Sequence, residues 1–456
     1  MTLLGTSPAP DTAPTTPTPL SHRLRTHPLT TELRRGIGPW AGLAVLVVIA
    51  FGMGAHTNDW QGHWARTCDL LRSSGLLLGG PLALAAGCWS GGRERRRRTG
   101  ALRASLPRTP LRQTLLAAAP AVLWPAVGYL LAAAGSLLAT WPYAGGGRPF
   151  LSLIAADAVA IASLSLLGFV AGRLVPWRLT APLLAALGYV ALGAPTYSAR
   201  NSRWLSPALE HSYDWDRPVW WFGAAAAVWT AGLAAAALLG YAARVRAVAL
   251  VPLAAAVGAA VLLVHTADDL WRPDPGAAAL VCDDGAPAVC VTVVESRLLP
   301  EVSRATAGLR AKLRGVEGAP ERLVGGPWED GPGHRQKPRY APAKGTDRLT
   351  GLEFAVVRDH LTDPALYANS AAGELLQDHD CTSAEADGDT RYGERATNIN
   401  DAVVQWLAPV PSFSYYGEGA ERQLKKIEAM SDGERKAYLT KYFAADPCDP
   451  KQVPVP

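Results

Sequence analysis

The stretch LSLIAADAVAIASLSLLGFVAG, residues 151–172, decides the fold class of this chain. It contains one charged residue, Asp157, among residues that are otherwise apolar or small. A hydrocarbon layer about 30 Å thick is crossed by roughly 20 apolar residues in a helix. Backbone groups in lipid must form hydrogen bonds within their own segment, which also favours a helix. The stretch is therefore expected to be a transmembrane helix.

Six other segments of residues 37–264 have the same character, and they surround this one in the chain. They are 37–54, 70–89, 113–140, 179–195, 219–241 and 248–264. The sequence thus predicts a membrane α-helical bundle of about seven transmembrane helices, of which the first, fifth and seventh are short. Small residues allow helices to approach closely, and GLLLGG at 75–80 and AVGAA at 256–260 are candidates for such contacts. A composition rich in alanine explains either of them equally well.

Charge is distributed unevenly along the chain. Residues 1–264 contain 22 arginines, no lysine and 9 acidic residues, whereas residues 265–456 contain 22 basic and 30 acidic residues. Sixteen of the first 22 arginines lie in 1–36, 91–112, 173–178 and 242–247, and five lie in the alternate loops. Loops that stay in the cytoplasm carry an excess of arginine and lysine. A cytoplasmic N-terminus and an odd number of spans then place 265–456 outside the cell.

The first 36 residues are expected to be a cytoplasmic disordered arm. Residues 6–20 are rich in proline and threonine, a composition that does not form a packed core. The apolar segment begins only near Ile37, behind a longer polar region than a cleaved secretory signal has. An uncleaved signal-anchor is therefore expected.

The basic run GGRERRRRTGALRASLPRTP at 91–110 is expected to be an inner-face loop. Nucleic acid binding is disfavoured because no recognition fold surrounds it. The expected localisation is the cell membrane, with the lipid bilayer as a partner and no nucleic acid.

Residues 265–456 read as a soluble α+β extracytoplasmic domain. Strands are expected at VCVTVV (289–294) and LEFAVV (352–357), and an amphipathic helix at 297–314. Asp363 followed by Pro364 and the SDGE motif at 431–434 are typical of helix starts. The segment 315–348, rich in glycine and proline, is expected to be a long loop.

Four of the six cysteines lie in this domain and are candidates for disulfides, since such bonds persist outside the cytosol. They are Cys282, Cys290, Cys381 and Cys448. CDDGAPAVC at 282–290 has Asp-Gly between apolar residues, which favours a hairpin-like turn closed by a bridge. Four cysteines allow three pairings, and the sequence does not choose among them. A zinc site is the alternative, although no CxxC pair occurs.

No catalytic motif is visible in the chain, which is expected not to be an enzyme. RDHLTD at 358–363 and QDHDC at 377–381 place histidine beside aspartate, but HExxH and GxSxG are absent. Solvated loop residues are the simpler account of both segments. No metal site is expected.

Two charged residues fall within the expected spans. Arg72 lies near the outer end of the second span, and Asp157 lies about two turns into the fourth. Ionisable residues in lipid are costly and often mark a pathway or an ion pair. A salt bridge between them would lower the cost, and a snorkelling Arg72 is the alternative.

The loop after the second span carries a further pattern. Leu102 and Leu106 share one face of a short helix, which the following prolines end before the third span. The arrangement of Glu94, Gly100, Leu102, Leu106 and Pro107, with Arg112 opening the next span, resembles the coupling loop of exporter-type ABC transporter permeases. The outer domain behind the last span resembles that of actinomycete permease-like membrane proteins. The family commonly has six spans, whereas seven are expected here.

The resemblance implies a permease subunit that forms the membrane pathway and docks on a separate ATPase through the 91–112 loop. It implies an ABC ATPase subunit and a second permease subunit as partners. No GxxxxGK[ST] motif occurs, so this chain is expected to hold no cofactor, with ATP on the partner subunit. The alternative is a multi-pass membrane anchor that presents an extracytoplasmic ligand-binding or sensor domain. The cargo, the direction of transport and the oligomeric state are left open by the sequence.

Overall fold

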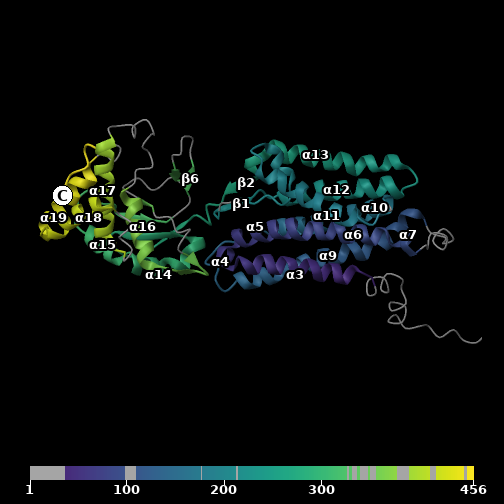
Figure 1. Ribbon diagram of the computed structural model, residues 1–456, viewed down its shortest axis with the longest axis horizontal. Coiled ribbons are helices and arrows are strands. Elements are labelled where there is room, and N and C mark those ends of the chain that lie inside the picture. Colours follow the sequence, from purple (N-terminus) through teal and green to yellow (C-terminus); the bar gives the residue numbers. More distant parts are fainter. Residues whose placement is uncertain are drawn as a thin grey trace, which may run out of the picture.

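The computed structural model describes most of the chain. It covers residues 36–97, 109–175, 177–211, 214–325, 328–330, 336–338, 348–349, 356–376, 390–410, 417–445 and 449–456. The molecule is elongated, with a helical bundle at one end and a mixed domain at the other (Figure 1). The arm expected at the N-terminus lies outside the described residues, apart from Gly36.

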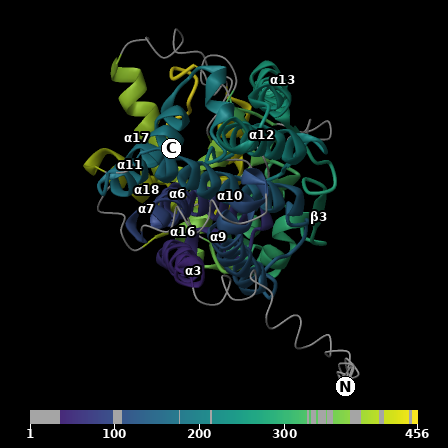
Figure 2. The same cartoon turned by 90° about the vertical axis from the view of Figure 1, so that its right-hand side faces the viewer.

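The bundle is made of helices that run along the long axis of the molecule (Figure 1). They are α3 (Gly38–Ala55), α4 (Thr57–Trp60), α5 (Trp64–Ser74), η1 (Gly75–Gly79), α6 (Gly80–Gly91), α7 (Arg93–Arg97), α9 (Pro110–Thr140), α10 (Leu151–Leu174), α11 (Thr180–Gly193), η2 (Ala194–Tyr197), η3 (Asn201–Leu205), α12 (Phe222–Ala242), η4 (Arg246–Ala249), α13 (Leu250–Thr266) and η5 (Ala267–Leu270). Seen along its length, α6 lies near the centre, and α3, α9, α10 and α11 all contact it (Figure 2).

Within the described residues, six helices are long and apolar enough to cross a membrane. They are Gly38–Ala55, Trp64–Arg97, Pro110–Thr140, Leu151–Leu174, Phe222–Ala242 and Arg246–Leu270. This is compatible with a multi-pass membrane protein. The expected span at 179–195 is a helix, α11, but its 14 residues measure only about 21 Å.

The chain nevertheless passes along the bundle a seventh time. One end of the bundle is arginine-rich, because α7 lies there. The last turn of α10 reaches this end, where Gly172 lies against the backbone of Cys88. At the other end, α12 begins with Phe222, whose ring lies 6.1 Å from that of Trp271. Residues 175–221 therefore join opposite ends of the bundle, and α11 covers only part of that length.

Glycines set the closest helix contact in the bundle, between α6 and α10. A Cβ atom at Gly87 would overlap the carbonyl of Ser165, and one at Gly168 would overlap that of Leu84. Gly91 and Gly172 make the same kind of contact one turn further along. By contrast, GLLLGG contacts side chains of neighbouring helices, and nothing lies within 4 Å of a Cβ atom at Gly258 in the AVGAA segment.

The C-terminal domain follows the last helix of the bundle. Its elements are β3 (Leu280–Cys282), β4 (Ala288–Thr292), η6 (Val293–Leu298), α14 (Leu299–Ala305), α15 (Ala307–Leu313), β5 (Arg322–Val324), β6 (Trp328–Asp330), β7 (Gln336–Pro338), β8 (Arg348–Leu349), β9 (Val356–Val357), β10 (His360–Leu361), α16 (Pro364–Leu376), α17 (Thr390–Leu407), α18 (Glu418–Ala429) and α19 (Asp432–Ala444). A small sheet has the order β3-β4-β5-β8, antiparallel between β3 and β4 and parallel elsewhere. One apolar core joins this sheet to the helices.

Several local expectations for this domain are confirmed. Asp363 accepts hydrogen bonds from the backbone of Ala365 and Leu366 at the start of α16. Ser431 and Glu434 form a complete capping box at the start of α19. The helix expected at 297–314 is instead divided into α14 and α15.

One other expectation for this domain needs correction, and another is confirmed where it can be followed. The segment 315–348 is not only a loop, because β5 within it pairs with β4. Of the strand expected at 352–357, the described residues are Val356 and Val357, which pair with β10.

The two parts of the molecule contact each other directly. A short antiparallel ladder joins β1 (Asp216–Pro218) to β2 (Trp271–Pro273) where the bundle ends. Trp215 donates from its indole to Thr292 in β4 over 3.0 Å. Arg358 donates to the side-chain amide oxygen of Gln61 at 2.5 Å. These hydrogen bonds connect bundle loops to the first strands and turns of the C-terminal domain.

Candidate functional site

Arg72 and Asp157 lie together inside the bundle, in the ion pair that the sequence allowed as one of two alternatives. Nε of Arg72 is 3.8 Å from a carboxylate oxygen of Asp157, and the two side chains are 4% and 3% exposed. Tyr129 of α9 donates its hydroxyl to the other Asp157 oxygen over 3.3 Å. Arg72 is therefore buried rather than snorkelling, and it contacts three neighbouring parts of the bundle.

Two further contacts hold the Arg72 guanidinium. Nε donates to the carbonyl oxygen of Pro207 at 2.5 Å, and the group lies 5.2 Å from the ring centroid of Phe222. Nη1 is buried and has no hydrogen-bond partner among the described residues. A buried donor without a partner costs free energy, so such a group is expected to have a functional or structural reason.

The charge cluster extends along α5 toward the C-terminal domain. Asp69 is 9% exposed and lies one turn before Arg72, whose charge acts on it. Arg66, a further turn away, forms an ion pair with Asp214 at 2.6 Å. Residues three apart share one face of a helix, so these three charges form a row. The spacing of Arg66, Asp69 and Arg72 is a signal for such a row in the sequence.

A π-helical turn follows Arg72 directly. η1 separates α5 from α6 within the continuous helix Trp64–Arg97. Such turns are rare and occur frequently at functional sites. The turn sits beside Tyr129, because a Cβ atom at Gly75 would lie 2.7 Å from its ring. The buried ion pair and the irregular turn are thus adjacent.

At the arginine-rich end, Glu94 forms a bidentate ion pair with Arg173. The two nitrogen–oxygen distances are 2.6 and 2.8 Å, and the side chain of Arg173 is 7% exposed. The guanidinium also lies 4.7 Å from the ring centroid of Phe169. The pair connects α7, which leads into the loop with the expected coupling residues, to the last turn of α10.

The remaining residues of the expected coupling loop, Gly100, Leu102, Leu106 and Pro107, lie outside the described residues. Thr109 is the next described residue, and its side chain accepts a hydrogen bond from the backbone of Arg112 at the start of α9. The third long helix therefore begins at Pro110, three residues before the expected 113.

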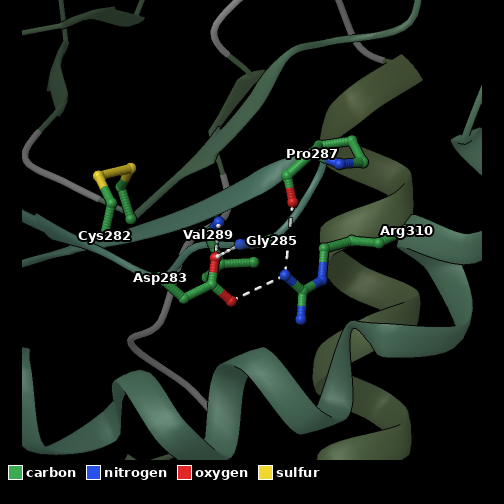
Figure 3. The surroundings of a disulfide bond; sticks show 7 residues. Cys282, Asp283, Gly285, Pro287, Val289 and Arg310 are labelled. Carbon is green, nitrogen blue, oxygen red and sulfur yellow. Dashed lines mark hydrogen bonds and ion pairs between the residues drawn. A yellow bond between two sulfur atoms is a disulfide. The ribbon is translucent and has the colours of Figure 1, made fainter.

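The expected bridge between Cys282 and Cys290 is present, and it closes the β3–β4 hairpin at its paired residues (Figure 3). Cys381 and Cys448 lie outside the described residues. Within the hairpin, the carboxylate of Asp283 accepts from the backbone of Gly285 and Val289 and from Arg310 (Figure 3). Asp283 therefore has a structural role, because its hydrogen bonds hold the hairpin turn together.

Burial alone would raise the pKa of Asp283. Hydrogen bonds from Ser303 and the backbone, together with the charge of Arg310, lower it overall. The carboxylate is therefore held in its charged form inside the hairpin.

The histidine-containing segments show no metal site within the part of the chain that the structure describes. His360 forms an ion pair with Glu301 over 2.8 Å and is 70% exposed, in keeping with a solvated loop. QDHDC at 377–381 lies outside the described residues.

Comparisons with protein-family models, with curated proteins and with solved structures gave no match.

Proposed function

We propose that this chain is the membrane-spanning subunit of an ABC transporter, with its arginine-rich end in the cytoplasm and its C-terminal domain outside the cell. The bundle would form part of the membrane pathway. A separate ATPase would dock on the 91–112 loop, and a second permease subunit would complete the pathway. The chain itself would hold no nucleotide.

The observation that carries the proposal is the ion pair between Glu94 and Arg173. A loop that receives force from a partner must pass that force to the helices of the bundle. Glu94 is joined to α6 through the chain and to α10 through Arg173. The glycine contacts then bring α6 and α10 against each other over two turns. A displacement of the loop would therefore move both helices together.

The charges support a role for the bundle beyond anchoring. A simple anchor needs no buried ion pair, because each charge costs free energy when it leaves water. Arg72, Asp157 and Asp69 lie instead in the interior of the bundle. They are close to the irregular segment of Pro207, on the side of the C-terminal domain. This is where an exit from a membrane pathway would lie, and the C-terminal domain would cover it.

The proposal is tested at the docking loop. We expect Leu102→Asp together with Leu106→Asp to abolish co-purification of an ATPase with the chain and to stop ATP-dependent transport. The matched control changes the same two positions to methionine, which preserves apolar volume. If the Asp variant still co-purifies with the ATPase and still supports transport, the docking hypothesis is wrong. The anchor alternative predicts no ATPase partner with either variant.

A further inference from the structure

A cavity of about 80 Å³ opens at the arginine-rich end of the bundle. It lies between the end of α6, α7, the end of α10 and the turn that precedes α11. Its wall combines guanidinium groups with indole rings. The side chains that matter here are Trp89, Arg95, Arg96, Val175, Trp177 and Arg178.

The positive charge of this cavity is not neutralised by the described protein. The titratable side chains that act on Arg96 are those of Cys88, Arg178 and Arg97, and no carboxylate is among them. Arg95 and Arg178 form no hydrogen bond or ion pair with any described residue. Glu94 is the nearest carboxylate along the chain, and both of its oxygens are bound to Arg173. No described residue therefore supplies a negative charge to the cavity.

The surroundings of the cavity are apolar. Trp89 is 47% exposed and Trp177 is 58% exposed, and Leu174 and Leu179 beside them are each more than half exposed. Arg96 stacks on the Trp89 ring at 4.3 Å and donates to the Trp89 carbonyl oxygen. Tryptophan is enriched where a membrane protein meets the boundary between hydrocarbon and water. The opening thus lies between the arginine-rich helix α7 and the apolar sides of the neighbouring helices.

We propose that this cavity binds the phosphate headgroup of an anionic phospholipid, with the acyl chains along the exposed leucines. Arginine binds phosphate through parallel N–H groups, and basic pockets between helices on the cytoplasmic side bind such headgroups. The apolar border favours a lipid over an acidic protein surface or a nucleic acid, neither of which would cover it. This inference requires the bundle to be in a membrane, but it does not require the ATPase.

The test measures lipid retention by the purified full-length chain in detergent. Native mass spectrometry would count the phosphatidylglycerol and phosphatidylcholine molecules retained from an equimolar mixture with the same acyl chains. We expect a preference for phosphatidylglycerol that falls at least about tenfold in the variant Arg95→Gln with Arg178→Gln, because charge-assisted hydrogen bonds to the phosphate are lost.

The matched control is Arg244→Gln with Arg246→Gln, which removes the same charge. These arginines are exposed at the same end of the bundle, because the end of α12 lies beside Arg173. We expect the control to retain phosphatidylglycerol as the unchanged chain does. An equal loss in both variants would show diffuse surface attraction and would overturn the site.

Three further outcomes would also overturn the inference. The first is retention of both lipids in equal amounts by the unchanged chain. The second is displacement of phosphatidylglycerol by an equal concentration of inorganic phosphate, which would make the free anion the ligand. The third is loss of ATPase binding in the cavity variant with lipid retention unchanged, which would assign the cavity to the partner. Vesicle flotation reports membrane insertion separately, so a failure of the proposed membrane location is distinguishable.

Discussion

Arg72 is held by neighbours that come from separate parts of the chain. Asp157, Pro207 and Phe222 each contact it, and each belongs to a different element or loop. One long side chain thus ties α5 to α10, to the segment after α11 and to α12. The charge of Arg72 was visible in the sequence, which left both an ion pair with Asp157 and a snorkelling side chain open. The carbonyl of Pro207 could not be expected, because backbone groups in irregular segments leave no sequence pattern.

We expect Asp157→Asn to destabilise the chain by about 3 kcal/mol, because breaking a buried ion pair from one side leaves the other charge uncompensated. Thermal unfolding in detergent micelles would measure the loss. The control Tyr129→Phe removes only the hydroxyl donor and should cost about 1 kcal/mol. Equal effects of the two changes would mean that the charge interaction contributes little. A transport assay on the same variants would separate stability from function.

The Glu94–Arg173 pair provides a second prediction at this scale. We expect Glu94→Gln and Arg173→Gln each to lower the free energy of unfolding, with a coupling energy of about 1–3 kcal/mol in the double-mutant cycle. The exchange of charges, Glu94→Arg with Arg173→Glu, should recover part of the loss. Chemical denaturation of the four variants in detergent is the measurement. Additive effects would show that the two side chains do not interact.

A pH prediction concerns Asp359, which lies in the turn that contacts the bundle. Burial raises the pKa of Asp359 to about 6, the charges of Arg297 and His360 oppose the rise, and that of Glu301 adds to it. The value in an unfolded chain is about 3.9. Between about pH 4 and 6 the folded protein keeps a proton that the unfolded chain has lost, so this residue lowers stability as pH rises through that window.

We therefore expect the stability of Asp359→Asn, relative to that of the unchanged chain, to increase as pH rises from about 4 to 6. Above about pH 6 the difference in stability between the two should stay constant. Asparagine tolerates the positive φ of 66° at this position. Unfolding midpoints measured across the window would report the difference. The control Asp284→Asn changes an exposed aspartate of the same domain. A difference that does not vary with pH would contradict the assignment.

Among the elements, α6 and α10 depend most on the absence of side chains. Gly87 and Gly168 each face a backbone carbonyl of the opposite helix. Small residues at this spacing let helix backbones approach closely in membranes. The sequence shows many glycines and alanines, so composition alone could not identify which of them make contacts. The AVGAA segment was a candidate for a close helix contact, but its Gly258 faces open space.

We expect Gly87→Ala to destabilise the chain by about 1–3 kcal/mol, because the added methyl group must displace the backbone of α10. The matched control is Gly258→Ala, in α13. There alanine meets no atom within 4 Å and should stabilise the helix by up to about 1 kcal/mol. Opposite signs in thermal unfolding are the expected result. Equal effects at both positions would show that helix propensity, and not packing, determines the change in stability.

The long helices themselves followed well from the sequence. The starts and ends of the first and fourth agree with the expectation to within two residues, because apolar runs of that length have few alternative structures. The second is much longer than expected, since Trp64–Arg97 includes polar turns at both ends that hydropathy does not mark. In the C-terminal domain, capping residues predicted two helix starts. The parallel pairing of β4 with β5 involves distant residues and could not be predicted.

At the scale of the whole molecule, the main prediction is the orientation of the two ends. We expect Val455→Cys to react with a membrane-impermeant maleimide on intact cells, because this residue is 51% exposed in the C-terminal domain. Arg244→Cys, exposed at the arginine-rich end, should react only after lysis. Mass spectrometry of the labelled chain is the readout. The reverse pattern would place the C-terminal domain in the cytoplasm and would end the transporter proposal as stated.

The shortness of α11 has an electrical consequence. Its 14 residues leave about 9 Å of a 30 Å hydrocarbon layer to the 3₁₀ turns η2 and η3 and to the segment that contains Pro207. Peptide dipoles polarise more readily than hydrocarbon, so in a bilayer the transmembrane voltage would fall over a shorter distance here. Arg72 lies against this segment, and part of the applied field would act on it. Transport measured in vesicles under potassium diffusion potentials should then depend on voltage, and Arg72→Gln should weaken that dependence.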